Sequence, residues 1–463
     1  MRTRATVTRY IAVPVRAERA RTPMSGRVRL AAWASISALV LGTCGCATSS
    51  PARPDSKPST PASPSAHSSP SMAMQSTQLS PLDPKKQPVE LRTEMEELFG
   101  QDVFVSVRVI RSRLRSDPDF TQAAVSAFFR NSNDLTTLIG RVYGSARAAE
   151  FRRLWESQQD GLVAYARADS QHDQDAKAAA RSQLDPLPGR IAQFLHNLTA
   201  GGVATADISS RLRTHLNDLM QFTDAYSAGD YATAYRIERV GYERQFQLGT
   251  VIAAGIVGGR AKDLPASFNS PLTQLRSALG ELLGEHMQLM VDAMGAALRG
   301  GPEFKADAAQ VNEDTTALAG AFGVLFGPQS GAKFENVWSS HIEALISYSA
   351  AVADKDQQAK AQAIAKYHAF ERNLSTFLAT STDGRLKAPA LATVLRMHDS
   401  ELVKQLDAYA RGDFTTEYSV IYDGYQHMFM VAQVLSAAIG PTIAARLPKG
   451  GAETGGGGMA RTR

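Results

Sequence analysis

The sequence predicts an all-α protein whose body consists of two related helical bundles that arose by internal duplication. Residues 89–445 are rich in Ala, Leu, Gln, Glu and Arg, and their apolar residues recur at spacings of three and four. β-branched alternation is almost absent, and the breaks fall at Gly, Pro and Asp. The same strings also return later in the chain, which is the signature of a repeated architecture.

The coarse repeat has one constant offset of 183 residues. Segment 154–165 matches segment 337–348, including a shared Trp and a shared terminal Tyr, and segment 224–231 matches segment 407–414. The first half therefore covers about 89–260, and the second covers about 272–442.

Each half contains three smaller units that read as a helix, a short turn and a second helix. The expected turns lie near 116–118, 170–172 and 229–230 in the first half, and near 300–302, 353–356 and 411–413 in the second. Asp413 is placed to cap the helix that follows it. This gives six αα-hairpins, or about twelve helices. The fourth helix of the first half is interrupted by the string Asp185-Pro-Leu-Pro188.

The N-terminus predicts a lipoprotein signal peptide over 1–46. A short basic region, 24–30, precedes the apolar run 31–41 and the string Gly42-Thr-Cys-Gly-Cys46. A small residue before cysteine resembles the bacterial lipobox, and Gly45 before Cys46 fits it better than Thr43 before Cys44. We therefore expect lipidation of Cys46 and an anchor on the extracytoplasmic face of the cell membrane. An ordinary cleaved signal is the alternative, and Met1 and Met24 are both candidate starts.

Two further segments are expected to lack a core. Residues 47–88 are dominated by Ser, Pro, Ala and Thr, which predicts a disordered tether, and the Gly-rich residues 448–463 predict a flexible tail. The formal charge of +5 is concentrated at the start, because residues 1–45 hold eight arginines and one glutamate. The remainder is slightly acidic, which argues against nucleic acid as a partner.

A polar layer is expected across the middle of the second bundle. His286, His341 and His398 open its three units, and the positions equidistant from each turn are Asp314, His368 and His427. Residues equidistant from an antiparallel turn lie at one height, so all six should share a level. The equivalent layer in the first half is also polar and includes His215. That layer offers few metal ligands.

Such a layer predicts a transition-metal site, because several buried imidazoles without partners are costly. Imidazole suits Cu and Zn, and nearby methionines such as Met287, Met397 and Met428 favour copper. We rank copper first and zinc second, with a role in binding, storage or sensing. The alternative is a structural hydrogen-bond network in a metal-free scaffold or protein-interaction module. A protein partner would then bind the first bundle.

The enzyme motifs considered are missing or incomplete in this sequence, so the sequence does not predict a catalytic activity. The Glu-x-x-His pairs of di-iron bundles are missing from the layer, and the string 330–333 matches Ser-x-x-Lys without its companion motifs. The strings 338–348, 397–398 and 412–428 resemble uncharacterised secreted helical-repeat lipoproteins of Gram-positive bacteria. That resemblance implies a secreted location and no particular activity.

Overall fold

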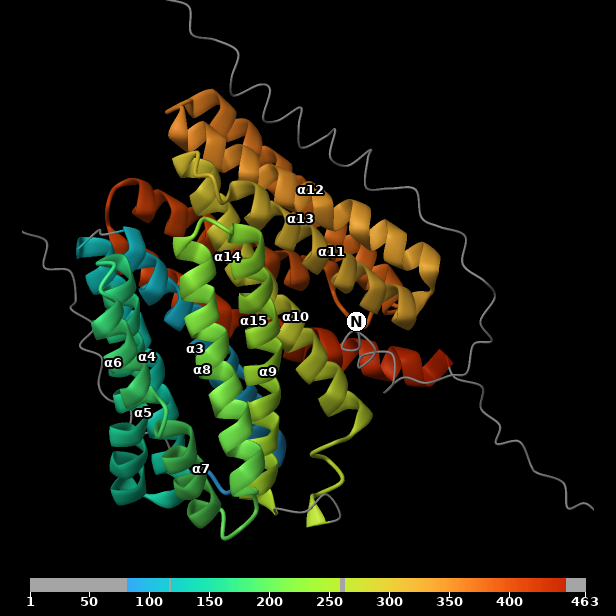
Figure 1. Cartoon of the computed structure of the whole chain (residues 1–463). Helices are drawn as coiled ribbons and strands as arrows, with labels where there is room; N and C mark the ends of the chain where they lie inside the picture. Colours follow the sequence, from blue (N-terminus) through green and yellow to red (C-terminus); the bar gives the residue numbers. More distant parts are fainter. Residues whose placement is uncertain (1–80, 116–117, 259–262, 447–463) are drawn as a thin grey trace, which may run out of the picture. The chain divides into compact units, whose positions relative to one another are not determined.

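The computed structural model describes residues 81–115, 118–258 and 263–446, and no β-strand occurs within these ranges. The expected all-α class is confirmed (Figure 1). The expected signal peptide, almost all of the expected tether and the expected tail lie outside the described residues.

The first half contains α3 (Pro88–Arg115), α4 (Pro118–Tyr143), α5 (Ser145–Ser170), α6 (Gln174–Leu184), α7 (Leu187–Leu198), α8 (Thr205–Ser227) and α9 (Tyr231–Val257). The second contains α10 (Pro271–Arg299), α11 (Phe304–Phe326), α12 (Pro328–Ala353), α13 (Gln357–Ser381), α14 (Ala388–Ala410) and α15 (Phe414–Arg446). The helices α6 and α7 are the two pieces of the helix that the prolines were expected to interrupt.

Aspartate caps begin the helices after four of the expected turns. The side chains of Asp173, Asp230, Asp356 and Asp413 each accept a hydrogen bond, 2.9–3.1 Å long, from the backbone N–H three residues later. Gly300 ends α10 in the left-handed conformation, with φ of 62°. Local capping chemistry therefore fixes where the hairpins turn.

Equivalent helices begin 183 residues apart. The paired starts are Pro88 and Pro271, Ser145 and Pro328, Gln174 and Gln357, Thr205 and Ala388, and Tyr231 and Phe414. The packing repeats as well, because α3 contacts α5, α8 and α9 just as α10 contacts α12, α14 and α15. These spacings are consistent with the expected duplication.

One side-chain contact recurs at the same offset. The Tyr165 hydroxyl lies 3.0 Å from Asp224 Oδ1, and the Tyr348 hydroxyl lies 3.1 Å from both carboxylate oxygens of Asp407. A lysine contacts the aspartate in each half. Since both halves use the same polar contact between their third and fifth helical segments, the similarity extends from the chain path to the packing.

The two halves meet through residues that are equivalent in the repeat. The hydroxyls of Tyr242 and Tyr425 lie 3.3 Å apart, and the rings of Phe246 and Phe429 stack with centroids 6.2 Å apart. Gly284 makes the approach possible, since a Cβ there would lie 2.9 Å from the Tyr242 hydroxyl. All described helices accordingly belong to one compact unit, with α3 against α10 and α4 against α15.

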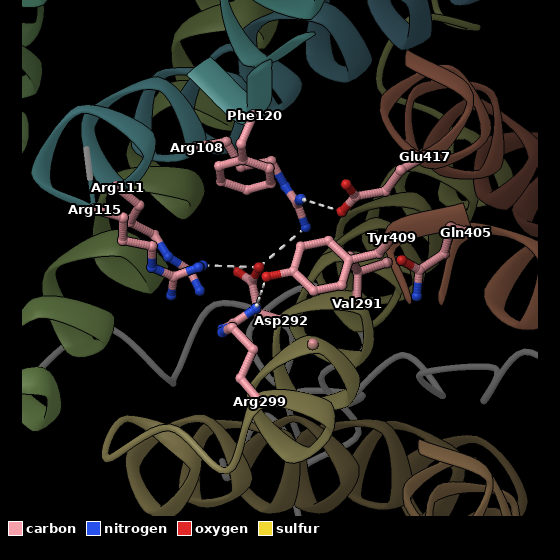
Figure 2. A pocket seen from close by; sticks show the side chains of 11 residues that line it. Arg108, Arg111, Arg115, Phe120, Val291, Asp292, Arg299, Gln405, Tyr409 and Glu417 are labelled. Carbon is pink, nitrogen blue, oxygen red and sulfur yellow. Dashed lines mark hydrogen bonds and ion pairs between the residues drawn. The ribbon is translucent and has the colours of Figure 1, made fainter. Parts of the chain in front are cut away.

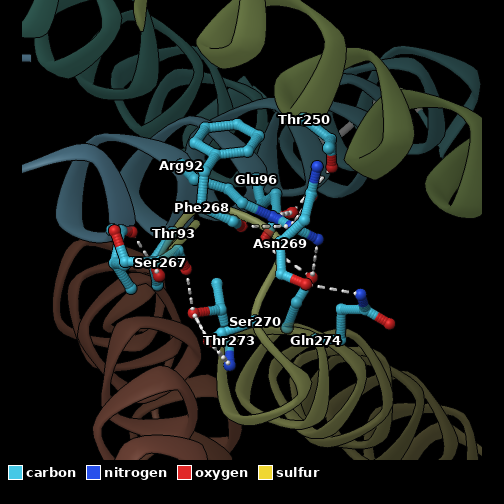
Figure 3. Close-up of polar contacts among 12 residues, drawn as sticks. Arg92, Thr93, Glu96, Thr250, Ser267, Phe268, Asn269, Ser270, Thr273 and Gln274 are labelled. Carbon is cyan, nitrogen blue, oxygen red and sulfur yellow. Dashed lines mark hydrogen bonds and ion pairs between the residues drawn. The ribbon is translucent and has the colours of Figure 1, made fainter. Parts of the chain in front are cut away.

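A buried polar cluster ties the segment between the halves to three helices (Figure 3). Arg92 of α3 donates to the Phe268 carbonyl at 2.8 Å and to Glu96 at 2.7 Å. Glu96 also accepts from Thr250 of α9 at 2.6 Å and from Ser277 of α10 at 2.9 Å. The connection between the halves is therefore anchored in the interior.

Among the described helices, α15 is long and apolar enough to cross a membrane, and half of its most apolar window is buried in the structure. Core helices have the same length and composition, so this feature is weak evidence for a span.

Candidate metal centre

Three histidines of the expected layer come together in the interior of the second half. His286 lies on α10, His341 on α12 and His398 on α14, and these three helices contact one another. Their ring centroids are 5.6, 5.8 and 6.1 Å apart. The exposed fractions are 0%, 0% and 4%. We call this group the histidine triad.

The triad has the composition of a metal site, and its geometry is close to one. One ring nitrogen from each histidine lies within 4.8 Å of the others. Three nitrogens bound to one zinc ion at about 2.0–2.1 Å are roughly 3.3–3.5 Å apart. An ion would therefore draw the three rings inward by about 1 Å, which small side-chain rotations supply.

Burial keeps the three imidazoles neutral. Desolvation lowers the pKa of His286 to about 3 and that of His398 to about 3. Desolvation, followed by the proximity of the other two rings, lowers the pKa of His341 well below its usual value. Neutral imidazoles keep a free lone pair for a metal at neutral pH.

Several nitrogens of the triad are buried without a hydrogen-bond partner. They are Nε2 of His286 and both ring nitrogens of His341 and of His398. Buried polar atoms are normally satisfied, because an unsatisfied one costs about 1–3 kcal/mol. A metal ion held by the three rings would satisfy one nitrogen of each ring.

Two buried aspartates lie behind the triad. Asp314 on α11 has Oδ2 3.1 Å from Nδ1 of His286, and Asp399 on α14 has Oδ1 3.2 Å from Nδ1 of His341. Burial raises the pKa of Asp314 to about 8 and that of Asp399 well above its usual value. A carboxyl group hydrogen-bonded to a ligating histidine fixes its tautomer and orientation and directs Nε2 toward the metal. Asp314 makes such a hydrogen bond to His286, whereas Asp399 lies near His341 without one. Asp314 is thus placed as a partner of a ligand.

Two other expected ligands lie outside the triad. His427 on α15 pairs with Glu401, and 27% of its side chain is exposed. His368 on α13 lies 3.0 Å from Glu371, and 41% of its side chain is exposed. The structure therefore brings together three of the six expected residues.

Asp399 was missed by the sequence reasoning, although it directly follows His398. Adjacent residues on a helix point about 100° apart, so the inward direction of His398 does not indicate that Asp399 is also buried. Both side chains are inside because α14 contacts α12 as well as α10. Burial on two sides is a tertiary feature that the spacing within one helix does not indicate.

Aromatic and apolar side chains enclose the triad. Trp338 lies 4.6 Å from the His286 ring, and Phe370 stacks on His341 at 4.3 Å. An apolar cavity of about 30 Å³ borders His398 and is also lined by Met428. Of the other expected methionines, Met397 is 39% exposed. The surroundings are aromatic and apolar, and Met428 places a thioether side chain at the cavity beside His398.

The first half has a different set of residues at the equivalent positions. Val103, Gln158 and His215 occupy the places of His286, His341 and His398, and each is buried. His215 Nε2 lies 3.2 Å from Asp102 Oδ2. The polar layer thus continues in the first half with a single histidine.

Comparison with known proteins identifies no relative. No family model matches the chain, and no curated protein or solved structure matches it. The class of protein is therefore defined by the fold and the histidine triad alone: an all-α helical protein with a buried candidate metal centre.

Proposed function

We propose that this chain binds a transition metal ion through the histidine triad, with copper as the first candidate and zinc as the second. The observation that supports the proposal is the convergence of three neutral, buried imidazoles whose lone pairs meet no hydrogen-bond donor. Imidazole nitrogen suits both metals, and the thioether of Met428 at the neighbouring cavity favours Cu(I). The role is binding, storage or sensing.

The proposed location is the extracytoplasmic face of the cell membrane, with a lipid anchor on Cys46. This part rests on the basic and apolar segments and on the string Gly45-Cys46. A metal-binding lipoprotein of this kind would use histidine as its main ligand, since both cysteines of the chain lie within the proposed signal.

A second candidate function is a metal-free helical scaffold or protein-interaction module. The observation that favours it is the polar layer of the first half, which persists with His215 beside Asp102 and without a triad. In this case the histidines of the second half would serve only to fix the packing of the hairpins.

Metal analysis of the purified full-length chain separates the two candidates. The chain is equilibrated with copper or zinc and desalted, and the retained metal is measured. We expect about one ion per chain, lost in the double variant His341→Ala, His398→Ala. The matched control is His368→Ala, His427→Ala, which removes two expected ligands outside the triad and should retain the ion. Equal retention by all three proteins would remove the triad as the site.

Tryptophan fluorescence adds a readout of where the metal binds. Trp338 contacts His286, whereas its repeat equivalent Trp155 packs against Phe99 and Phe151 in the first half. Bound Cu(II) should quench Trp338, so the quenching should persist in Trp155→Phe and largely disappear in Trp338→Phe. Quenching that does not depend on Trp338 would place the copper elsewhere.

A further inference from the structure

A polar cavity of about 20 Å³ lies where α3 of the first half meets α10, α14 and α15 of the second (Figure 2). Four arginines line it, and we call them the arginine cluster: Arg108, Arg111, Arg115 and Arg299. Figure 2 shows their guanidinium groups directed toward one another around Asp292 and Tyr409. The cavity is far richer in cations than a structural salt bridge requires.

Two carboxylates serve all four guanidinium groups. Asp292 Oδ1 lies 3.0 Å from Arg108 and 2.8 Å from Arg111. Glu303 Oε1 lies 2.7 Å from Arg115 and 2.9 Å from Arg299. Each carboxylate thus carries one negative charge against two positive ones.

Burial favours the neutral form of the neighbouring acids. Glu417 lies 3.8 Å from the nearest arginine nitrogen, and burial raises its pKa to about 8. Burial also raises the pKa of Asp307 to about 8 and that of Glu238 well above its usual value. Asp292 stays ionised, because Arg111 and Arg108 hold its pKa low against the opposing effect of burial. The four guanidinium groups are therefore paired closely with two carboxylates, and Glu417 is a more distant third partner.

Unpaired donors face the same cavity. Arg108 Nε is buried and has no hydrogen-bond partner. Gln405 is 1% exposed. The only hydrogen-bond partner of its amide Nε2 is the thioether sulfur of Met294, at 4.0 Å. Thioether sulfur is a weak acceptor. An ion that accepts hydrogen bonds from these two donors would satisfy them and offset part of the excess charge.

We propose that this cavity binds one halide ion, with chloride as the expected species. The volume of about 20 Å³ admits a monatomic anion. Arg115 and Arg299 form the entrance, since 21% and 24% of their side chains are exposed while the deeper Arg108 is 6% exposed. The site is independent of the histidine triad.

Bromide tests the site directly, because it substitutes for chloride and scatters anomalously. Crystals of the full-length chain grown with sodium bromide should show one anomalous peak inside the arginine cluster. Crystals of Gln405→Leu should lose that peak. Gln245→Leu is the matched control, since it removes an equally buried amide that does not line this cavity. Absence of the peak from the wild-type protein overturns the proposal and leaves a water molecule as the occupant.

If Gln405→Leu does not fold, thermal unfolding of the wild-type chain provides a second test. At equal ionic strength, replacing sodium gluconate by sodium chloride should raise the Tm of the wild-type chain, because an ion that binds only the folded state stabilises it. Tyr409→Phe removes the hydroxyl that accepts from Arg299 at 3.0 Å, at a half-buried position that tolerates the change. The difference in Tm between the chloride and gluconate salts should differ between this variant and the wild-type chain. Identical Tm values in the two salts would contradict halide binding.

Discussion

Acid should destabilise the metal-free protein through His398, and the size of the effect follows from its burial. Desolvation holds the pKa of His398 at about 3 in the folded chain, against an ordinary value of 6.5. The unfolded chain therefore takes up a proton below pH 6.5 that the folded chain does not. A lowered folded pKa contributes stability that is present above pH 6.5 and lost as the pH falls.

The magnitude at pH 5.0 is about 2 kcal/mol, from about 1.36 kcal/mol per pH unit over the interval below the unfolded pKa. His398→Gln removes the titrating group and leaves a neutral polar side chain of similar length. The cost of burying the glutamine is the same at both pH values and cancels in the comparison. Asp314 has a raised pKa and acts with the opposite sign, and it also cancels because it is present in both proteins.

The assay is urea unfolding of the full-length chain at pH 7.5 and pH 5.0 in the presence of a chelator. Wild type should lose about 2 kcal/mol more than His398→Gln between the two values. His368→Gln is the control for the same replacement at a layer histidine outside the triad, whose side chain is 41% exposed. Equal pH dependence of wild type and His398→Gln would refute the reasoning that His398 is buried in the neutral form.

Three further predictions address the site, the packing and the cluster between the halves. Asp399→Asn should weaken metal binding by about 10–100-fold in a competition titration, because a metal on His341 favours an ionised carboxyl group behind it that an amide does not replace. Gly249→Ala should lower the free energy of urea unfolding by about 1–3 kcal/mol, since its Cβ would lie 2.5 Å from the backbone oxygen of Met95 on the crossing helix. Asp292→Asn should cost about 3–5 kcal/mol in the same assay, because it leaves two buried guanidinium groups without their anion.

The helices were predictable because their boundaries are encoded locally. Residues such as Asp356 and Asp413 each cap the helix that follows, and Gly300 supplies the left-handed end of α10. Helical spacing of apolar residues then identifies the segments between the turns. The packing of hairpins against one another has no such local signal, which is why the meeting of the two halves at Tyr242 and Tyr425 was not foreseen.

The sequence predicted the level along the helices at which the candidate site lies. It did not predict which side chains at that level point toward one another. Counting outward from the turns placed six residues on one level, and the triad lies together because α10, α12 and α14 contact one another. The return helices α11, α13 and α15 pack against these three from other sides. His368 and His427 consequently meet glutamates nearer the surface. Which helix of each hairpin faces its neighbours is decided by tertiary packing, and spacing within one hairpin does not encode it.

Comparison of the two halves bears on why the triad exists. Helices α3, α5 and α8 make the same pairwise contacts as α10, α12 and α14, yet they carry Val103, Gln158 and His215 where the second half carries its three histidines. The packing therefore does not need three imidazoles. Burying imidazole nitrogens without partners costs free energy, and the second half carries more of this cost. Both ring nitrogens of His215 lack a partner in the first half, whereas five of the six ring nitrogens of the histidine triad lack one in the second. Under the proposed function, a bound metal ion would offset the additional cost in the second half.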